Sequence, residues 1–289
     1  MPDESTSVLT PPSLPAEVVP PATPPKSRLR WAIHLAIMAA LPLVAGLSGS
    51  VVDRKGPALT SSARGLLVVS GFEVLFFAVF LGLAWLASRA SKDDLLLRWR
   101  PRFWVFPLGA MYSVAIRISV GIVAWWGLRI AFAFNGADPE RYLKDHQPNV
   151  GALVDLHALA HDSTYFWLNV LLVSFVVGGL REELWRSSFL AGLRALWPRT
   201  FSSNRGGIAA AAVAAVFFGA GHLPQGTLAA MMVTIVGFLL GVIMSVHRSI
   251  WPSVIAHGFF DAASMVLIFL LQYLPQLRQA AELLKDIAH

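Results

Sequence analysis

The chain has 289 residues, of which 56% are hydrophobic and only 14% are charged, and its formal net charge is +6. Soluble globular proteins carry about 25% charged residues, so the composition excludes an ordinary soluble protein, a coiled coil and a disordered chain. Because cysteine is absent, disulfides, a thiol nucleophile and a thiolate metal site are also excluded. Excess basic charge is typical of the cytoplasmic loops of membrane proteins, so we expect a lipid bilayer and no nucleic acid as partner.

Residues 1–30 differ in composition from the rest of the chain. They hold eight of the eighteen prolines and no aromatic residue. Such a segment cannot bury an apolar core, and we expect a disordered, proline-rich cytoplasmic tail. A signal peptide with a long basic region is the alternative to a retained first span.

Seven apolar segments follow, each long enough to cross about 30 Å of hydrocarbon as a helix. No strand-like alternation is visible, so the sequence predicts an all-α polytopic transmembrane helix bundle of about seven spans, with six to eight as the range. Leu223-Pro224-Gln225 is the only break between the fifth and sixth spans and predicts a tight helical hairpin. The predicted spans are 31–52, 66–88, 104–134, 165–193, 207–223, 226–246 and 251–273.

The distribution of basic residues predicts the orientation of the bundle. With the N-terminus in the cytoplasm, twelve lysines and arginines fall in inner segments and seven in outer segments. The positive-inside rule favours this arrangement, in a bacterial inner (plasma) membrane.

We divide the rest of the chain into N-terminal helices and loops (31–164), a core (165–273) and a polar C-terminal tail (274–289).

Charged residues inside the spans need a partner or a function, because each costs at least about 2.5–3.5 kcal/mol at a helix centre. Glu73 in the second span and Arg117 in the third both come out roughly 10 Å below the outer surface. We therefore predict an ion pair between them. A place on a substrate path is the alternative.

Two acids and an arginine follow a Gly178-Gly179 pair at the cytoplasmic end of the fourth span. On a helix, Arg186 can reach Glu182 one turn away at i,i+4 or Glu183 at i,i+3. A paired, partly desolvated glutamate can act as a general base towards water. A charge cluster that only marks the helix end is the alternative.

Two histidines and an aspartate complete the candidate site. His257 and Asp261 share a helix face at i,i+4, so the carboxylate can orient the imidazole. His222 ends the fifth span after several small residues. Structural roles, as a helix cap and a His–Asp bond, are the alternatives. Straight helices put Glu182 and His257 roughly 10 Å from the cytoplasmic side and His222 nearer the outer side.

The combination in this order resembles the CAAX protease and bacteriocin-processing (CPBP) family of intramembrane endopeptidases, including type II CAAX prenyl endopeptidases. The resemblance rests on Phe218-x-x-x-His222 and His257-x-x-x-Asp261 and covers about residues 165–272. HExxH, GxSxG and Walker A motifs are absent. The first motif departs from the family's EExxxR. Aligned on Arg186, the first acid is replaced by Arg181; aligned on Glu182-Glu183, the arginine comes one residue early.

The resemblance implies that a glutamate and the first histidine activate water, which attacks a peptide bond of a membrane-associated protein or peptide with a prenylated-CAAX-like end. It gives Glu182, or Glu183 in its place, the role of the base with His222. His257 and Asp261 then stabilise the oxyanion or orient the water. The cofactor is a divalent metal such as Zn²⁺, as in a metalloprotease, or none. Arg181 motivates the alternative of a catalytically inactive relative that acts as an immunity, scaffold or binding protein.

A second group of titratable residues lies in the outer loop between the third and fourth spans. His157 and His161 are spaced i,i+4 between Asp155 and Asp162. A surface metal site is one interpretation. A solvated amphipathic turn is the other, and the polar surroundings favour it.

Overall fold

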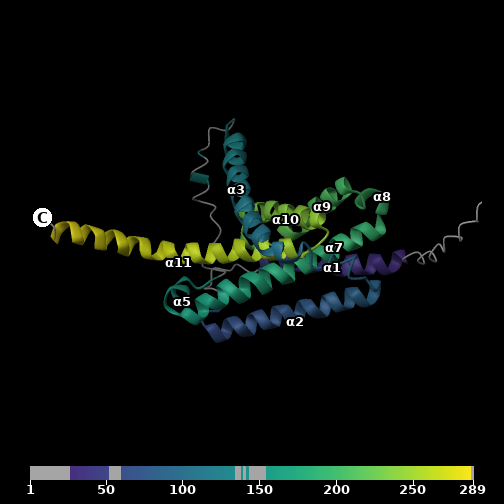
Figure 1. Ribbon diagram of the computed structural model, residues 1–289, viewed down its shortest axis with the longest axis horizontal. Helices are drawn as coiled ribbons and strands as arrows, with labels where there is room; N and C mark the ends of the chain where they lie inside the picture. Colours follow the sequence, from purple (N-terminus) through teal and green to yellow (C-terminus); the bar gives the residue numbers. More distant parts are fainter. Residues whose placement is uncertain (1–26, 52–59, 134–137, 139–140, 143–153, 288–289) are drawn as a thin grey trace, which may run out of the picture.

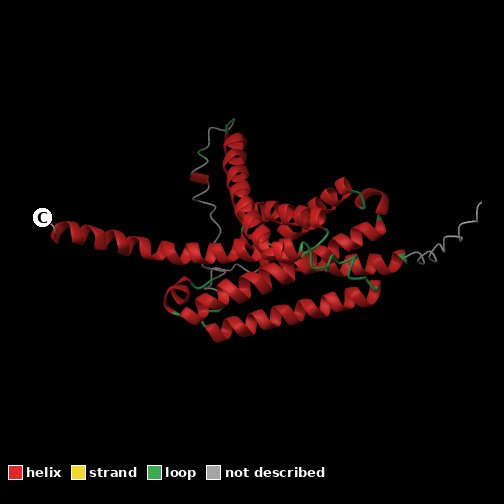
Figure 2. Ribbon diagram, in the orientation of Figure 1, coloured by secondary structure: helices red, strands yellow, loops and turns green. Residues whose placement is uncertain are grey.

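The computed structural model describes residues 27–51, 60–133, 138, 141–142 and 154–287. The described residues are helical with no strand, which confirms the predicted all-α bundle (Figure 2). Figure 1 labels most of the helices, and the numbering below follows it. The longer helices are α1 (Arg28–Val51), α2 (Ala63–Ser88), α3 (Val105–Phe132), α7 (Glu182–Leu196), α9 (Asn204–Ala220), α10 (Thr227–His247) and α11 (Trp251–Ile287). The shorter ones are η1 (Arg102–Trp104), α5 (Leu156–His161), α6 (Ser163–Trp167), η3 (Leu168–Arg181), α8 (Pro198–Phe201) and η4 (Leu223–Gln225).

The lengths of these helices suit a multi-pass membrane protein. Among the described residues, five helical stretches are long and apolar enough to cross a membrane. The first and fifth predicted spans coincide with α1, of 24 residues, and α9, of 17 residues. The five stretches are Ala63–Ser88, Arg102–Ile130, Ser163–Leu196, Thr227–His247 and Trp251–Gln272.

Two predicted details of the chain path can be checked against the helices. The short break between the fifth and sixth spans is the single turn η4, which joins α9 to α10 as expected. The predicted polar tail 274–289 is helical as far as Ile287, because α11 continues through it. This segment is rich in Ala, Leu, Gln, Glu and Lys, which are strong helix formers. Figure 1 shows the end of α11 projecting from the bundle as a single helix.

The helices that carry the candidate site lie side by side. α6, η3 and α7 form one continuous helical stretch, which packs against α11, α2 and α1 (Figure 1). Within it, η3 has π-helical hydrogen bonding over 14 residues, a geometry that is often found at functional sites. α9 and α10 pack together as an antiparallel pair beside this stretch.

Glycines allow η3 and α11 to approach closely. A Cβ atom on Gly179 would lie 2.9 Å from the Val254 carbonyl oxygen, and one on Gly178 would collide with the Asp261 carboxylate. A larger residue at either position would push the two helices apart. The Gly178-Gly179 pair therefore sets the spacing between the helix that carries the two glutamates and the helix that carries His257.

A buried histidine holds α1 between α2 and α7. Both ring nitrogens of His34 lie 2.9 Å from backbone carbonyl oxygens, Nδ1 from that of Ala84 and Nε2 from that of Ser188. The Ser188 hydroxyl is also 3.0 Å from Nε2. Three helices thus meet at one fully buried imidazole.

We expect the change His34→Leu to lower the free energy of unfolding by about 1–3 kcal/mol, because it leaves buried polar groups without partners. Thermal unfolding of the purified protein in detergent measures the effect. His161→Leu removes an exposed histidine of α5 and serves as the control. Equal unfolding temperatures for the two variants would contradict this role of His34.

Candidate active site

A fully buried ion pair between Glu183 and Arg186 lies beneath the site. The Glu183 Oε1 atom accepts hydrogen bonds from the Arg186 guanidinium and from His257 Nδ1, the latter at 3.0 Å. Glu183 and Arg186 have no solvent exposure. Of the two pairings left open by the sequence, the structure therefore has Arg186 with Glu183, at i,i+3 on α7.

Glu182 has a different environment from Glu183, although the two are adjacent. Its side chain is 16% exposed and borders a cavity of about 360 Å³. Successive helical residues point about 100° apart, so one carboxylate faces the protein interior while the other faces the cavity. The polar lining of this cavity is Glu73, Arg181, Glu182, His222 and Gln225.

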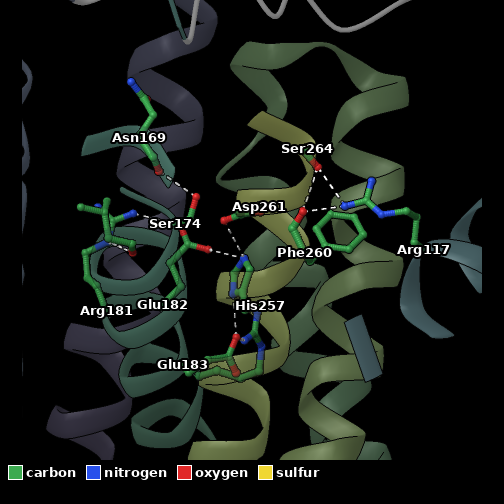
Figure 3. A network of polar contacts seen from close by, with 12 residues as sticks. Arg117, Asn169, Ser174, Arg181, Glu182, Glu183, His257, Phe260, Asp261 and Ser264 are labelled. Carbon is green, nitrogen blue, oxygen red and sulfur yellow. Dashed lines mark hydrogen bonds and ion pairs between the residues drawn. The ribbon is translucent and has the colours of Figure 1, made fainter. Parts of the chain in front are cut away.

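The ring of His257 lies between the acids of the site. Its Nδ1 faces Glu183, while its Nε2 is 3.7 Å from Glu182 Oε2 and 3.6 Å from Asp261 Oδ2. Figure 3 shows Glu182 and Glu183 reaching this ring from opposite sides. The two longer separations exceed a direct hydrogen bond but are within the range of an ion pair with a protonated imidazole. Asp261 is therefore near the imidazole, as the i,i+4 spacing predicts.

His222 borders the same cavity as Glu182. Its Nδ1 donates a hydrogen bond to the Phe218 carbonyl oxygen over 2.8 Å. In the neutral ring, Nε2 then carries the lone pair. This arrangement leaves Nε2 able to accept a proton or to polarise a bound water.

The estimate that places His222 nearer the outer side than Glu182 is wrong. It measures depth from the membrane surfaces along straight helices. The two helices instead run antiparallel from a common turn at α8, and both residues lie roughly four to six helical turns from it. Packing of α7 against α9 then brings Glu182 and His222 to one cavity.

The predicted ion pair between Glu73 and Arg117 is also wrong. Arg117 donates to the Phe260 carbonyl oxygen at 2.6 Å and to the Ser264 hydroxyl at 3.1 Å, with its guanidinium over the Phe260 ring. Equal depth does not imply adjacency, because α3 packs on α11 whereas α2 packs on η3. Figure 3 shows Arg117 and Arg181 on opposite sides of the helix that carries His257.

Arg181 is the partner of Glu73. One end of its guanidinium, Nη1, is 2.9 Å from Glu73 Oε2, and the other, Nη2, is 2.9 Å from Glu182 Oε1. Glu73 is thus a cavity residue from outside the three motifs. Its position inside a span marks it in the sequence as an unusual charge, but only the packing of α2 on η3 shows its partner.

Phe218 connects the two histidines and the buried arginine. Its ring is 4.7 Å from the His222 ring and 6.5 Å, edge-on, from the His257 ring, centre to centre. The Arg186 guanidinium lies 4.5 Å from the centre of the same ring. The spacing Phe218-x-x-x-His222 marks this aromatic residue in the sequence but not its contacts with Arg186 and His257.

The residues of the site do not fit a metal ion. Within the described ranges, no group of three or more His, Asp, Glu or Cys side chains could hold one. This includes the outer loop, where Asp155 and Asp162 accept hydrogen bonds from backbone N–H groups at the starts of α5 and α6. The helix-capping role of these aspartates agrees with the interpretation of this segment as a polar turn.

We expect the change Arg186→Met to lower the free energy of unfolding by about 3–5 kcal/mol, because it leaves the Glu183 carboxylate buried and uncompensated. The double change Glu183→Leu with Arg186→Met removes both charges, so it should recover part of that loss. Thermal unfolding in detergent measures both. Glu182→Leu is the matched control, and a double variant that recovers with Glu182→Leu instead of Glu183→Leu would contradict the observed pairing.

The comparison with known protein families agrees with this geometry. Residues 163–263 match the family model described as type II CAAX prenyl endopeptidase Rce1-like. The matched segment contains both glutamates, Arg186, both histidines and Asp261. No curated protein and no solved structure matches the chain. The resemblance predicted from the motifs is thereby confirmed over residues 163–263, which hold all three motifs and match the Rce1-like type II CAAX prenyl endopeptidase family.

Proposed function

We propose that this protein is an intramembrane endopeptidase that hydrolyses a peptide bond of a membrane-associated protein or peptide. The observation that carries the proposal is the shared cavity of Glu182 and His222 within a segment of the Rce1-like family. His257, whose Nε2 is 3.7 Å from Glu182 Oε2, adds a second imidazole next to this carboxylate. Carboxylate and imidazole groups around one cavity are suited to general acid–base chemistry on water.

Glu182 is the general base in this proposal. Its carboxylate borders the cavity, whereas that of Glu183 is fully buried and bound by Arg186 and His257. Glu182, with the Nε2 atom of His222, takes a proton from water as the water oxygen bonds to the scissile carbonyl carbon. The same proton then passes to the leaving amine as the C–N bond breaks. Glu183 is a positioning residue, because it fixes the orientation of the His257 ring.

His257 is placed to stabilise the oxyanion. An ionised aspartate has no hydrogen to donate, so the donor near the developing charge must be the imidazole rather than Asp261. In the proposal, His257 Nε2–H donates to the oxyanion, and Asp261, 3.6 Å from that nitrogen, orients the ring. No step passes through a metal ion.

The apolar part of the cavity wall suits a lipid-modified substrate. Phe72 and Phe76 of α2 line the cavity and are also 67% and 48% exposed on the outer surface of the helix bundle. A prenyl chain could lie along these rings while the peptide enters from the cytoplasmic side. From the distribution of basic residues, we propose that the protein lies in the plasma membrane with its N-terminus in the cytoplasm.

The ion pair between Arg181 and Glu182 favours one alternative function. A guanidinium on the proposed base occupies one of its two oxygens. In a catalytically inactive relative, the cavity would bind a membrane-associated protein without cleaving it. An immunity, scaffold or binding protein would use the site in this way.

Cleavage of a fluorogenic farnesylated peptide with a C-terminal CAAX sequence, by the purified protein in liposomes, tests the proposal. We expect Glu182→Gln, His222→Asn and His257→Asn each to lower the rate by at least about 100-fold, because each removes a proton-transfer or oxyanion group. Unchanged unfolding temperatures would show that the variants are folded. His161→Asn, at an exposed position of α5, is the matched histidine control.

Two outcomes would contradict the proposal. Full activity in the Glu182→Gln and His222→Asn variants would exclude the proposed catalytic residues. Saturable binding of the peptide without any cleavage by the unmodified protein would favour the inactive relative.

A further inference from the structure

Among the described residues that line the cavity, Glu73 is the one carboxylate from outside the segment of family resemblance. That segment begins at residue 163, whereas Glu73 lies on α2, close to the middle of an apolar helix. Its side chain is 37% exposed and ion-paired with Arg181. A charge at such a position is costly in a membrane and marks a functional role.

The geometry of Arg181 shows what Glu73 does to the proposed base. A guanidinium is a planar fork that commonly binds a carboxylate through two parallel N–H···O bonds. Here the fork is divided, with Nη1 on Glu73 Oε2 and Nη2 on Glu182 Oε1. Glu182 Oε2 is left without this contact and faces His257 Nε2 at 3.7 Å.

We infer that Glu73 is a positioning residue that keeps Arg181 from clamping both oxygens of Glu182. The inference rests on the proposed function, since it concerns the oxygen that would accept the proton from water. Without Glu73, both ends of the guanidinium can turn to Glu182 and engage its two oxygens. With Glu73, Arg181 orients Glu182 through Oε1 and leaves Oε2 for water and His257.

A purely structural ion pair makes a different prediction. If the contact between Glu73 and Arg181 only ties α2 to η3, removing either side chain weakens the packing, and removing both restores nothing. If Glu73 acts by restraining Arg181, its loss harms catalysis only while Arg181 is present. A double-mutant cycle separates the two roles.

The cycle uses Glu73→Leu, Arg181→Leu and the double variant in the farnesylated peptide assay. We expect Glu73→Leu to lower kcat on the order of 100-fold, as a misplaced catalytic group does, with KM nearly unchanged. The double variant should recover most of the lost kcat. Glu73→Asp, which keeps the charge, should retain more activity than Glu73→Leu. Asp93→Leu, which breaks the exposed ion pair with Arg98 in a loop, is the matched control.

A second readout does not depend on activity. Dicyclohexylcarbodiimide is an apolar reagent that forms an N-acylurea on accessible carboxyl groups, and mass spectrometry locates the adduct. We expect labelling of Glu182 in the unmodified protein, a several-fold decrease in Glu73→Leu and recovery in the double variant. If Glu73→Leu does not fold, Glu73→Gln replaces it in both measurements.

The two readouts distinguish failure of the inference from failure of the proposed function. Absence of cleavage by every chain, with the expected labelling pattern, would refute the endopeptidase and support the restraint of Arg181 by Glu73. Unchanged labelling of Glu182 in Glu73→Leu, or a double variant as inactive as the single one, would overturn the inference.

Discussion

The buried pair of Glu183 and Arg186 is the interaction on which the rest of the site depends. Two opposite charges without solvent exposure are stable only when each neutralises the other. Glu183 also accepts the hydrogen bond from His257 Nδ1, so the pair fixes one end of an imidazole on another helix. Within the described residues, Glu183 Oε2 and two nitrogens of Arg186 have no hydrogen-bond partner. A buried ion pair with unpaired polar atoms contributes little net stability to the fold. This agrees with a role of the pair in positioning the His257 ring.

The orientation of His257 follows from this pair and from the close contact of η3 with α11. The Gly178-Gly179 backbone lets α11 approach until Asp261 and His257 face Glu182. The other ring nitrogen, Nε2, is thereby directed towards the carboxylates of Glu182 and Asp261. The chemistry proposed for the cavity thus depends on the spacing of η3 and α11 as much as on which side chains border the cavity.

Local spacing predicted much of the site, because residues on one helix have fixed relations. The i,i+4 relation of His257 and Asp261, the Phe218-x-x-x-His222 motif and the hairpin at Leu223–Gln225 were all visible in the sequence. Relations between helices were not. Depth alone paired Glu73 with Arg117 and separated His222 from Glu182, and both conclusions were wrong because depth gives neither the direction of a side chain nor the neighbour of a helix.

The sequence by itself determined that this is a multi-pass membrane protein, that its fold is all-α, and which helices carry its unusual charges. These follow from composition and from the length of apolar runs, since every backbone polar group in lipid must be satisfied within a helix. Only the tertiary structure decided which glutamate Arg186 neutralises, and which glutamate is left facing the cavity. It also decided that Glu73 joins the site through Arg181. Those outcomes depend on how α2, η3, α9 and α11 pack, and side chains on different helices meet only once that packing is set.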